Sequence, residues 1–129
     1  MAKQKTKILI VEDEESLLFL YSIKLEQSGY EVIKASNGQE GFSLAKKELP
    51  NLILLDILMP EVDGYEMLAS LKKDKATKNI PAIIFSNLSQ KDEIEKGLKL
   101  GAKDFIIKTS ITPRELEDKV KEYLNNKNK

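Results

Sequence analysis

Side chains that could do chemistry stand at the ends of short apolar runs in this sequence. Glu12 and Asp13 follow the first run, Asp56 ends the third, Ser86 ends the fourth and Lys108 ends the fifth. A carboxylate such as Asp56, at the end of the apolar stretch LILLD, is costly to bury unless a charged group meets it. The pattern therefore predicts a charged site at one end of the folded domain.

The three carboxylates among these residues indicate a bound cation. Placed in one crevice, Glu12, Asp13 and Asp56 would repel one another unless a cation neutralised them. The chain has no His and no Cys, so the available ligand atoms are oxygens. Oxygen ligands favour a hard ion, and Mg²⁺ is the usual hard ion that keeps several waters. We therefore expect a Mg²⁺ site built from these acids.

The loop after the first run argues against a nucleotide or flavin site. Such sites use a Gly-rich or hydroxyl-rich turn whose backbone N–H groups hold phosphate. The segment VEDEES, residues 11–16, contains four acids and no Gly, so phosphate would enter only with a cation. A Mg²⁺ ion held by acids, a carboxylate that can attack, and a Lys and a hydroxyl that receive oxygens together indicate phosphoryl transfer onto an Asp.

Five apolar runs recur along the chain and predict strands. They are KILIV from Lys7, YEVIKA from Tyr30, NLILLD from Asn51, PAIIFS from Pro81 and DFIIK from Asp104. Each run is short and rich in β-branched residues, while the segments between the runs have helical period. Strands this uniformly apolar, covered on both faces, indicate a parallel sheet with right-handed crossovers. We predict a doubly wound α/β domain whose ligands bind at the carboxyl ends of the strands.

Start and stop signals of helices agree with this alternation. Two pairs have the spacing of a capping box, and two glycines fall just past helical segments, where a left-handed residue closes the last turn. These residues are Thr112 with Glu115, Asn37 with Glu40, Gly29 and Gly101.

Composition limits the domain count and the partners. With 129 residues, the chain is predicted to form a single domain over residues 1–129, with a core from about residue 5 to 124 and a short disordered C-terminal tail. Lys+Arg and Asp+Glu both number 21, so the zero formal charge argues against direct binding to nucleic acid or to a membrane. The absence of a signal-peptide pattern and of a membrane-length apolar run favours a cytoplasmic protein.

The chain resembles the receiver domain of two-component response regulators from Lys5 to about Leu124. The matching motifs are the acid pair Glu12–Asp13, Asp56 in DILMPEVDGYE, Ser86 after PAIIF and Lys108 after GAKDFII. The resemblance implies a CheY-like, flavodoxin-like (βα)5 fold with a five-stranded sheet in the order 2-1-3-4-5.

The resemblance also implies roles in phosphoryl transfer and signalling. Asp56 would accept the phosphoryl group from a phosphohistidine donor in a Mg²⁺-dependent reaction, and Ser86 and Lys108 would contact the phosphoryl oxygens. Phe105 stands at the family's switch aromatic position. Ser86 and Phe105 would then carry the signal to the surface formed by the fourth helix, the fifth strand and the last helix.

The metal ligands are likewise implied by the resemblance. They would be Asp13, Asp56, the backbone carbonyl of Leu58 and, through water, Glu12. Leu58 and Leu88 would border the approach of a hydrolytic water. Because neither side chain can hydrogen-bond to water, the phosphorylated form is predicted to be long-lived.

Two positions depart from the family pattern. Lys108 is followed by Thr109, where the family usually has Pro, often behind a cis bond. A cis bond before a residue other than Pro costs about 3 kcal/mol, so the geometry of this bond does not carry over. Asn87 follows Ser86 and is larger than the small residue usual there, which would hinder a phosphodonor.

Simpler interpretations exist for single residues. Asp13 could be the N-cap of the first helix, and Lys108 a solvated charge at a strand end. Phe105 is expected to be partly core and partly switch, and Gly64 to mark a turn. The joint occurrence of acids, a hydroxyl and a lysine at four strand ends favours a functional site.

The favoured function is a response regulator without enzymatic turnover of an external substrate. Its expected partners are a sensor histidine kinase or a histidine phosphotransfer protein and a downstream protein target, with a phosphorylation-dependent homodimer as a further interaction. The alternative is a phosphorylation-independent interaction module with the same fold. The intact Asp13, Asp56 and Lys108 argue against it, whereas Asn87 and Thr109 argue for it. An enzyme acting on an external substrate is third, because no cofactor loop or substrate-sized insertion is present.

Overall fold

One parallel sheet forms the centre of the molecule. The computed structural model describes residues 5–126, and within this range five strands pair in the order β2-β1-β3-β4-β5. The strands are β1 (Lys7–Val11), β2 (Glu31–Ala35), β3 (Leu52–Leu55), β4 (Ala82–Ser86) and β5 (Asp104–Ile107). Every neighbouring pair is parallel, which confirms the predicted topology and strand order.

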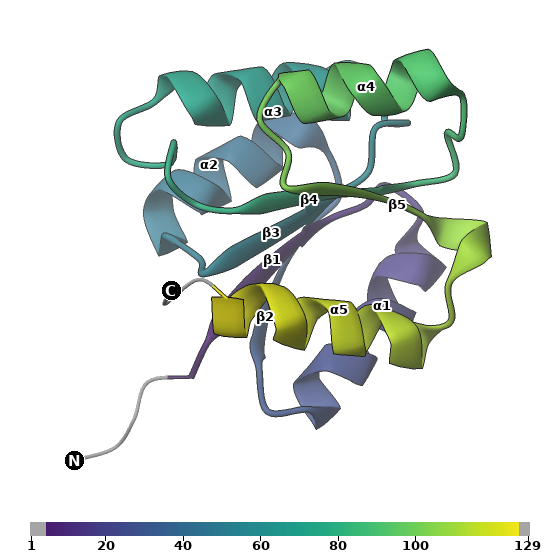
Figure 1. Cartoon of the computed structure of the whole chain (residues 1–129). Coiled ribbons are helices and arrows are strands. Elements are labelled where there is room, and N and C mark those ends of the chain that lie inside the picture. The colour runs from purple at the N-terminus through teal and green to yellow at the C-terminus, as the bar shows by residue number, and fades with distance from the viewer. Residues whose placement is uncertain (1–4, 127–129) are drawn as a thin grey trace.

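Helices cover both faces of this sheet (Figure 1). Helices α2 (Gly38–Glu48), α3 (Gly64–Lys73) and α4 (Lys91–Lys99) lie on one face, whereas α1 (Glu15–Gln27) and α5 (Pro113–Asn126) lie on the other. A short 3₁₀ turn, residues 108–110, follows β5. Among the described residues, no helix is long and apolar enough to cross a membrane.

Alternate residues of the central strands build two cores. In β1, Leu9 and Val11 belong to the core beneath α2 and α3, whereas Ile8 and Ile10 belong to the core beneath α1 and α5. Residues of β3 divide between the two cores in the same way. Successive side chains of a strand point to opposite faces, so a strand that is apolar throughout must be covered on both sides.

The edge strand β2 departs from the expected uniform burial. Glu31 and Lys34 are exposed, and Ala35 is the one fully buried residue of this strand. The strand has a neighbour on one side only, and charged residues on such an edge discourage pairing with another sheet.

Helix starts follow the predicted signals, with one correction. At α5, Thr112 Oγ1 accepts from the Glu115 N–H at 3.1 Å and the Glu115 carboxylate accepts from the Thr112 N–H at 2.9 Å, which completes a capping box. At α2, Asn37 Oδ1 accepts from the Glu40 N–H at 2.8 Å. The Glu40 carboxylate, however, accepts from the Ser36 N–H at 2.7 Å, so the expected reciprocal bond to Asn37 is replaced by a bond one residue earlier.

Helix ends also agree with the sequence, except at the C-terminus. Gly29 and Gly101 have φ angles of 96° and 113°, in the region that favours glycine, which confirms both predicted stops. The first part of the expected disordered tail is helical instead, because α5 continues to Asn126. Residues 127–129, on which the rest of that prediction falls, lie outside the described residues.

Gly64 brings the start of α3 against the backbone of Asp56. Its N–H donates to the Ile57 carbonyl at 3.1 Å, and a Cβ at this position would overlap the Asp56 carbonyl oxygen. Asp63 and Glu66 form a capping box that fixes the same turn, with bonds of 2.9 and 3.3 Å. Gly64 is thus the first residue of α3 and not the turn residue predicted, and its close approach holds the backbone that carries Asp56.

Gly64→Ala is expected to lower the free energy of unfolding by about 3 kcal/mol, because the overlapping atoms belong to the backbone and cannot move away easily. Gly29→Ala is the control. It has a positive φ but no atom within 4 Å, so backbone strain of about 1 kcal/mol is its only expected loss. Urea unfolding measures both values, and equal losses in the two variants would show that the close approach to Asp56 is not required.

Candidate functional site

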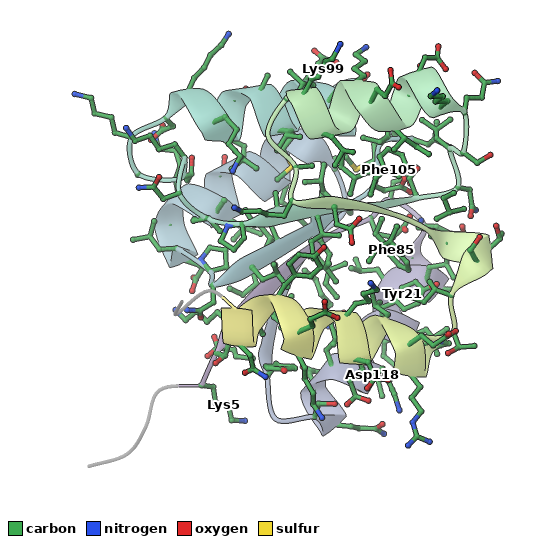
Figure 2. The ribbon with its side chains drawn as sticks, in the orientation of Figure 1. Lys5, Tyr21, Phe85, Lys99, Phe105 and Asp118 are labelled. Carbon is green, nitrogen blue, oxygen red and sulfur yellow. The ribbon has the colours of Figure 1, made fainter. Side chains whose placement is uncertain are left out.

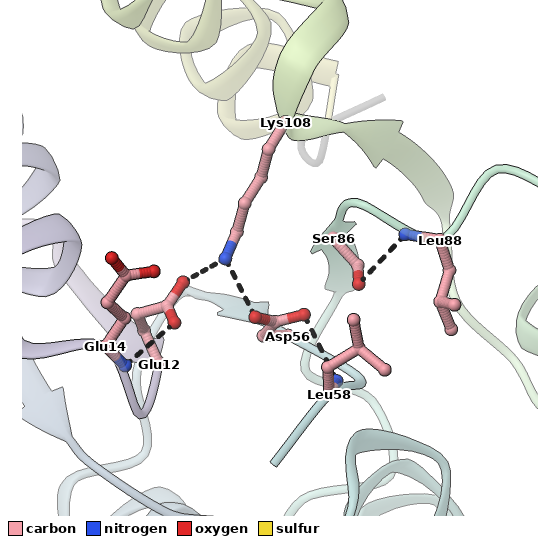
Figure 3. A network of polar contacts seen from close by, with 7 residues as sticks. All are labelled: Glu12, Glu14, Asp56, Leu58, Ser86, Leu88 and Lys108. Carbon is pink, nitrogen blue, oxygen red and sulfur yellow. Dashed lines mark hydrogen bonds and ion pairs between the residues drawn. The ribbon is translucent and has the colours of Figure 1, made fainter.

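The predicted site residues meet at the carboxyl ends of the strands. Glu12 and Asp13 lie in the loop after β1, Asp56 directly after β3, Ser86 at the end of β4 and Lys108 directly after β5. In Figure 3, Lys108 and Ser86 approach the Asp56 carboxylate from two sides. The parallel sheet thus gathers side chains that are as far as 96 positions apart in the sequence.

The Lys108 ammonium bridges two buried carboxylates. Its Nζ donates to Asp56 Oδ2 at 2.8 Å and to Glu12 Oε1 (Figure 3). None of the three residues is more than 9 % exposed. A lone charge of either sign at this depth would lose much of its hydration, so mutual pairing is what permits these charges to be buried.

Burial and pairing act in opposite directions on the titration of these groups. Burial raises the pKa of Glu12, and hydrogen bonds from Lys108 and from the Glu14 N–H only partly offset this effect. Burial also lowers the pKa of Lys108, but its hydrogen bonds to Asp56 and Glu12 and the attraction of their negative charges together outweigh burial and raise that pKa. Lys108 therefore stays a cation at neutral pH.

The acids form a cluster suited to a hard divalent cation. One carboxylate oxygen each from Glu12, Asp13 and Asp56 lie within 4.8 Å of one another. Three carboxylates around one ammonium leave an excess of negative charge, which a divalent ion would neutralise. Asp13 is exposed whereas the other two acids are buried, so the cluster opens to solvent on one side.

Leu58 and Ser86 flank the Asp56 carboxylate, and each takes part in one weak local hydrogen bond. The Leu58 N–H donates to Asp56 Oδ1 at 3.3 Å, which places the Leu58 backbone beside the carboxylate. Ser86 is fully buried, and its Oγ accepts from the Leu88 N–H at 3.5 Å, the outer limit of a hydrogen bond. The Ser86 hydroxyl can therefore change partner at little cost.

Phe105 is half-buried, which agrees with the expected partial place in the core, and it lies beneath α4. It pairs in register with Ile84 on the neighbouring strand, and Figure 2 shows its ring between the sheet and α4. A Cβ on Gly97 of α4 would lie 3.3 Å from the ring. Phe105 thus packs against the helix that follows Ser86.

Both simpler interpretations of single site residues are wrong. Asp13 does not cap α1, because Glu14 takes the N-cap position and its side chain makes no capping hydrogen bond. Lys108 is not a solvated strand-end charge, because it is buried and doubly paired.

The two departures from the family pattern have clear positions. Among the described residues no peptide bond is cis, so the Lys108–Thr109 bond is trans. Asn87 is exposed, beside Ser86, and lines a pocket next to the site.

Three supports of the site were missed by sequence reasoning. The Glu14 N–H donates to Glu12 Oε2 at 3.0 Å, Gly64 packs on the Asp56 backbone, and the Phe85 ring centroid lies 5.8 Å from Lys108 Nζ. The first is a local turn between residues two apart. The other two join separate elements, and only the Asp63-x-x-Glu66 capping spacing could have indicated a fixed turn beside Asp56.

Comparison with known proteins defines the family. The family model of the response regulator receiver domain matches residues 8–121. This match covers most of the chain and includes the acid cluster, Ser86 and Lys108. The chain belongs to the response regulator receiver domain family.

Similar proteins include regulators about twice as long as this chain and one protein of similar length. The probable transcriptional regulator ycf27 of Porphyridium aerugineum is 40% identical over 121 residues, which cover 94% of this chain and 49% of that protein. The alkaline phosphatase synthesis transcriptional regulatory protein PhoP of Bacillus subtilis is 40% identical over 118 residues, which cover 92% of this chain and 48% of PhoP. The chain thus spans about half the length of these curated relatives. Protein PilH of Pseudomonas aeruginosa is 37% identical over 102 residues, covering 79% of this chain and 84% of PilH.

Two solved structures agree with the fold. The CheY-like response regulator receiver domain protein from Methanospirillum hungatei superposes with a TM-score of 0.90 and 31% identity, covering 97% of this chain and 98% of the other. The signal receiver domain of a signal transduction histidine kinase from Syntrophus aciditrophicus superposes with a TM-score of 0.84 and 35% identity, covering 94% of this chain and 91% of the other. Both support the CheY-like, flavodoxin-like architecture.

Asp13→Asn is expected to raise the free energy of unfolding by roughly 1 kcal/mol in chelator at low salt, because it removes one of three mutually repelling carboxylates and leaves both ion pairs of Lys108 intact. Asp118→Asn, at an exposed aspartate of α5, is the matched control and should change the value by less than about 0.5 kcal/mol. Urea unfolding measures both. An Asp13→Asn protein no more stable than the parent would show that repulsion in the cluster is weak.

Proposed function

We propose that this receiver domain accepts a phosphoryl group on Asp56 from a phosphohistidine donor. The observation that carries the proposal is the position of the Asp56 carboxylate, which lies 2.8 Å from the Lys108 ammonium and in one cluster with Glu12 and Asp13. Ser86 adds a hydroxyl on the other side of the same carboxylate. These are the groups that transfer of a charged phosphoryl group to a carboxylate requires.

Mg²⁺ is the proposed cofactor of this reaction. Its direct ligands would be Asp13, Asp56 and the backbone carbonyl of Leu58, and Glu12 would act through water. When bound, the ion would neutralise charge on the phosphoryl oxygens. The oxygen donors within 4.8 Å of one another and the excess negative charge of the cluster support this assignment.

Transfer would proceed by in-line attack of an Asp56 carboxylate oxygen on the phosphorus of phosphohistidine. The O–P bond forms while the P–N bond breaks, and the electron pair of that bond stays on the imidazole, which takes up a proton. Lys108 can bind a phosphoryl oxygen without leaving the site, because its ammonium has three hydrogens and its two ion pairs use two. The weakly held Ser86 hydroxyl can turn to donate to another oxygen.

The proposed output is a change in protein binding. The upstream partner would be a sensor histidine kinase or a histidine phosphotransfer protein, and the downstream partner a protein target or a second copy of this chain. The new contact of Ser86 with a phosphoryl oxygen would shift the equilibrium of Phe105 and of the surface formed by α4, β5 and α5. We assign residues 5–124 to the core of one cytoplasmic receiver domain that turns over no external substrate.

Incubation with Mg²⁺ and acetyl phosphate is expected to add the mass of one phosphoryl group to the parent protein and none to Asp56→Asn. Asp63→Asn removes the next aspartate along the chain but keeps a side chain that can cap α3, so it should gain the mass as the parent does. Intact-protein mass spectrometry measures all three. A phosphoryl mass on Asp56→Asn would assign the acceptor to another residue.

The aspartyl phosphate is proposed to be long-lived for this family. Hydrolysis needs a water positioned in line behind the phosphorus. Leu58 is 53% exposed, Leu88 is half-buried, and both line a pocket of about 640 Å³ beside the site. Figure 3 shows the Leu58 side chain next to the Asp56 carboxylate. Two apolar side chains at this pocket offer no hydrogen bond to orient the water.

Replacing Leu58 with Asn and Leu88 with Glu together is expected to speed autodephosphorylation about tenfold, equivalent to ~1.4 kcal/mol, because polar side chains can orient a water. Leu49→Asn changes another exposed leucine, at the C-cap of α2, and should leave the rate unchanged. The loss of phosphoryl mass after removal of acetyl phosphate, at fixed Mg²⁺ concentration, gives the rates. A double variant that decays no faster than the parent would contradict the proposal.

A further inference from the structure

Helix α4 has few buried anchors of its own. Of its nine residues, all of them described, only Gly97 is fully buried. A Cβ on Gly97 would overlap Ile84 Cδ1, so glycine allows the helix to lie directly on the sheet. A glycine contact buries little apolar area and therefore contributes little hydrophobic stabilisation. The position of α4 must depend on other contacts as well.

Tyr65, from the first turn of α3, makes such a contact. Its hydroxyl lies 2.8 Å from the backbone carbonyl oxygen of Glu93 and 2.8 Å from a carboxylate oxygen of the same residue. Lys96, on the same side of α4, places its ammonium 4.4 Å from the centroid of the Tyr65 ring. Tyr65 is 7% exposed, and burial together with the Glu93 carboxylate raises its pKa, so the hydroxyl stays protonated and donates.

Tyr65 is also tied to the proposed phosphoacceptor. It follows Gly64, which packs directly on the Asp56 backbone. Residues 87–90 alone connect Ser86 to the start of α4. Tyr65 therefore links the loop that carries Asp56 to the helix that follows Ser86.

The loop between Ser86 and α4 has room to move. The pocket of about 640 Å³ is lined by residues of this loop, among them Leu88, and by Leu58 of the loop after β3. Tyr65, Glu93 and Lys96 line the same pocket. A shift of the loop toward the phosphoacceptor would draw the first turn of α4 with it and stretch the bonds from Tyr65 to Glu93.

We propose that Tyr65 is a positioning residue that holds α4 in its unphosphorylated position. The hydroxyl hydrogen bond, shared between two oxygens of Glu93, then stabilises this position against the one that follows phosphorylation, and its loss shifts the equilibrium toward the latter. The first part of the inference concerns the resting protein alone. The second part rests on the proposed phosphorylation of Asp56.

Hydrogen–deuterium exchange of the unphosphorylated protein tests the first part. Tyr65→Phe keeps the buried ring and is expected to speed amide exchange in residues 91–99 about fivefold to tenfold, because loss of one hydrogen bond shifts local opening by about that factor. Tyr123→Phe is the matched control. Its hydroxyl donates at 2.7 Å to Asp104 Oδ2 of β5 and not to a residue of α4, so exchange in α4 should change much less than in Tyr65→Phe. No acceleration in α4, or an equal one in every helix, would overturn the inference.

The rate of phosphorylation by acetyl phosphate tests the second part. Tyr65→Phe is expected to react about fivefold faster than the parent, because the resting position is less stable. Glu93→Gln keeps an oxygen acceptor for the hydroxyl and should react like the parent, a rescue that a general loss of stability would not give. An unchanged or lower rate for Tyr65→Phe would overturn the second part. A parent protein that gains no phosphoryl group would refute the proposed function and the second part with it, while the exchange data would still decide the first.

Discussion

The ammonium of Lys108, held between two buried carboxylates, is the interaction on which the rest of the site depends. Strand β4 lies between β5 and β3 in the sheet, so the Lys108 side chain must extend across the end of β4 to reach Asp56. This path explains why Phe85 and Ser86, the last residues of β4, border the site. The charges can stay buried because each has a partner, yet the acids still outnumber the lysine. The paired charges can therefore be buried in the folded protein, while the excess negative charge still favours binding of a cation.

Much of the fold and of the site could be predicted because the decisive signals are local. Four of the five strands end at or beside a residue of the candidate site, as with Asp56 after β3, whereas the edge strand β2 does not. Parallel strands bring their carboxyl ends to one edge, so residues at those ends must meet even though they are far apart in sequence. The capping box of Thr112 and Glu115 was likewise predictable, because both partners lie within one turn.

The remaining contacts have no local signal. Glu40 could accept from either of two adjacent N–H groups, and the sequence does not decide between Ser36 and Asn37. The bond from Tyr65 to Glu93 joins residues 28 positions apart on two helices, and their spacing follows no periodic pattern. Such contacts depend on the position of each helix relative to the sheet. Packing at residues such as Gly97 determines that position. We propose that a change at the site reaches the surface through such contacts.

Direct identification of the modified residue is the sharpest measurement for the central claim that Asp56 accepts the phosphoryl group. After reaction with acetyl phosphate and Mg²⁺, borohydride reduces an aspartyl phosphate to an alcohol and releases phosphate, which leaves a stable mark on the acceptor. Peptide mass mapping of the reduced protein then locates the mark. We predict a single reduced side chain at position 56, next to Lys108 and the acid cluster. A mark at another aspartate, or no mark in protein that has demonstrably gained a phosphoryl group, would contradict the assignment.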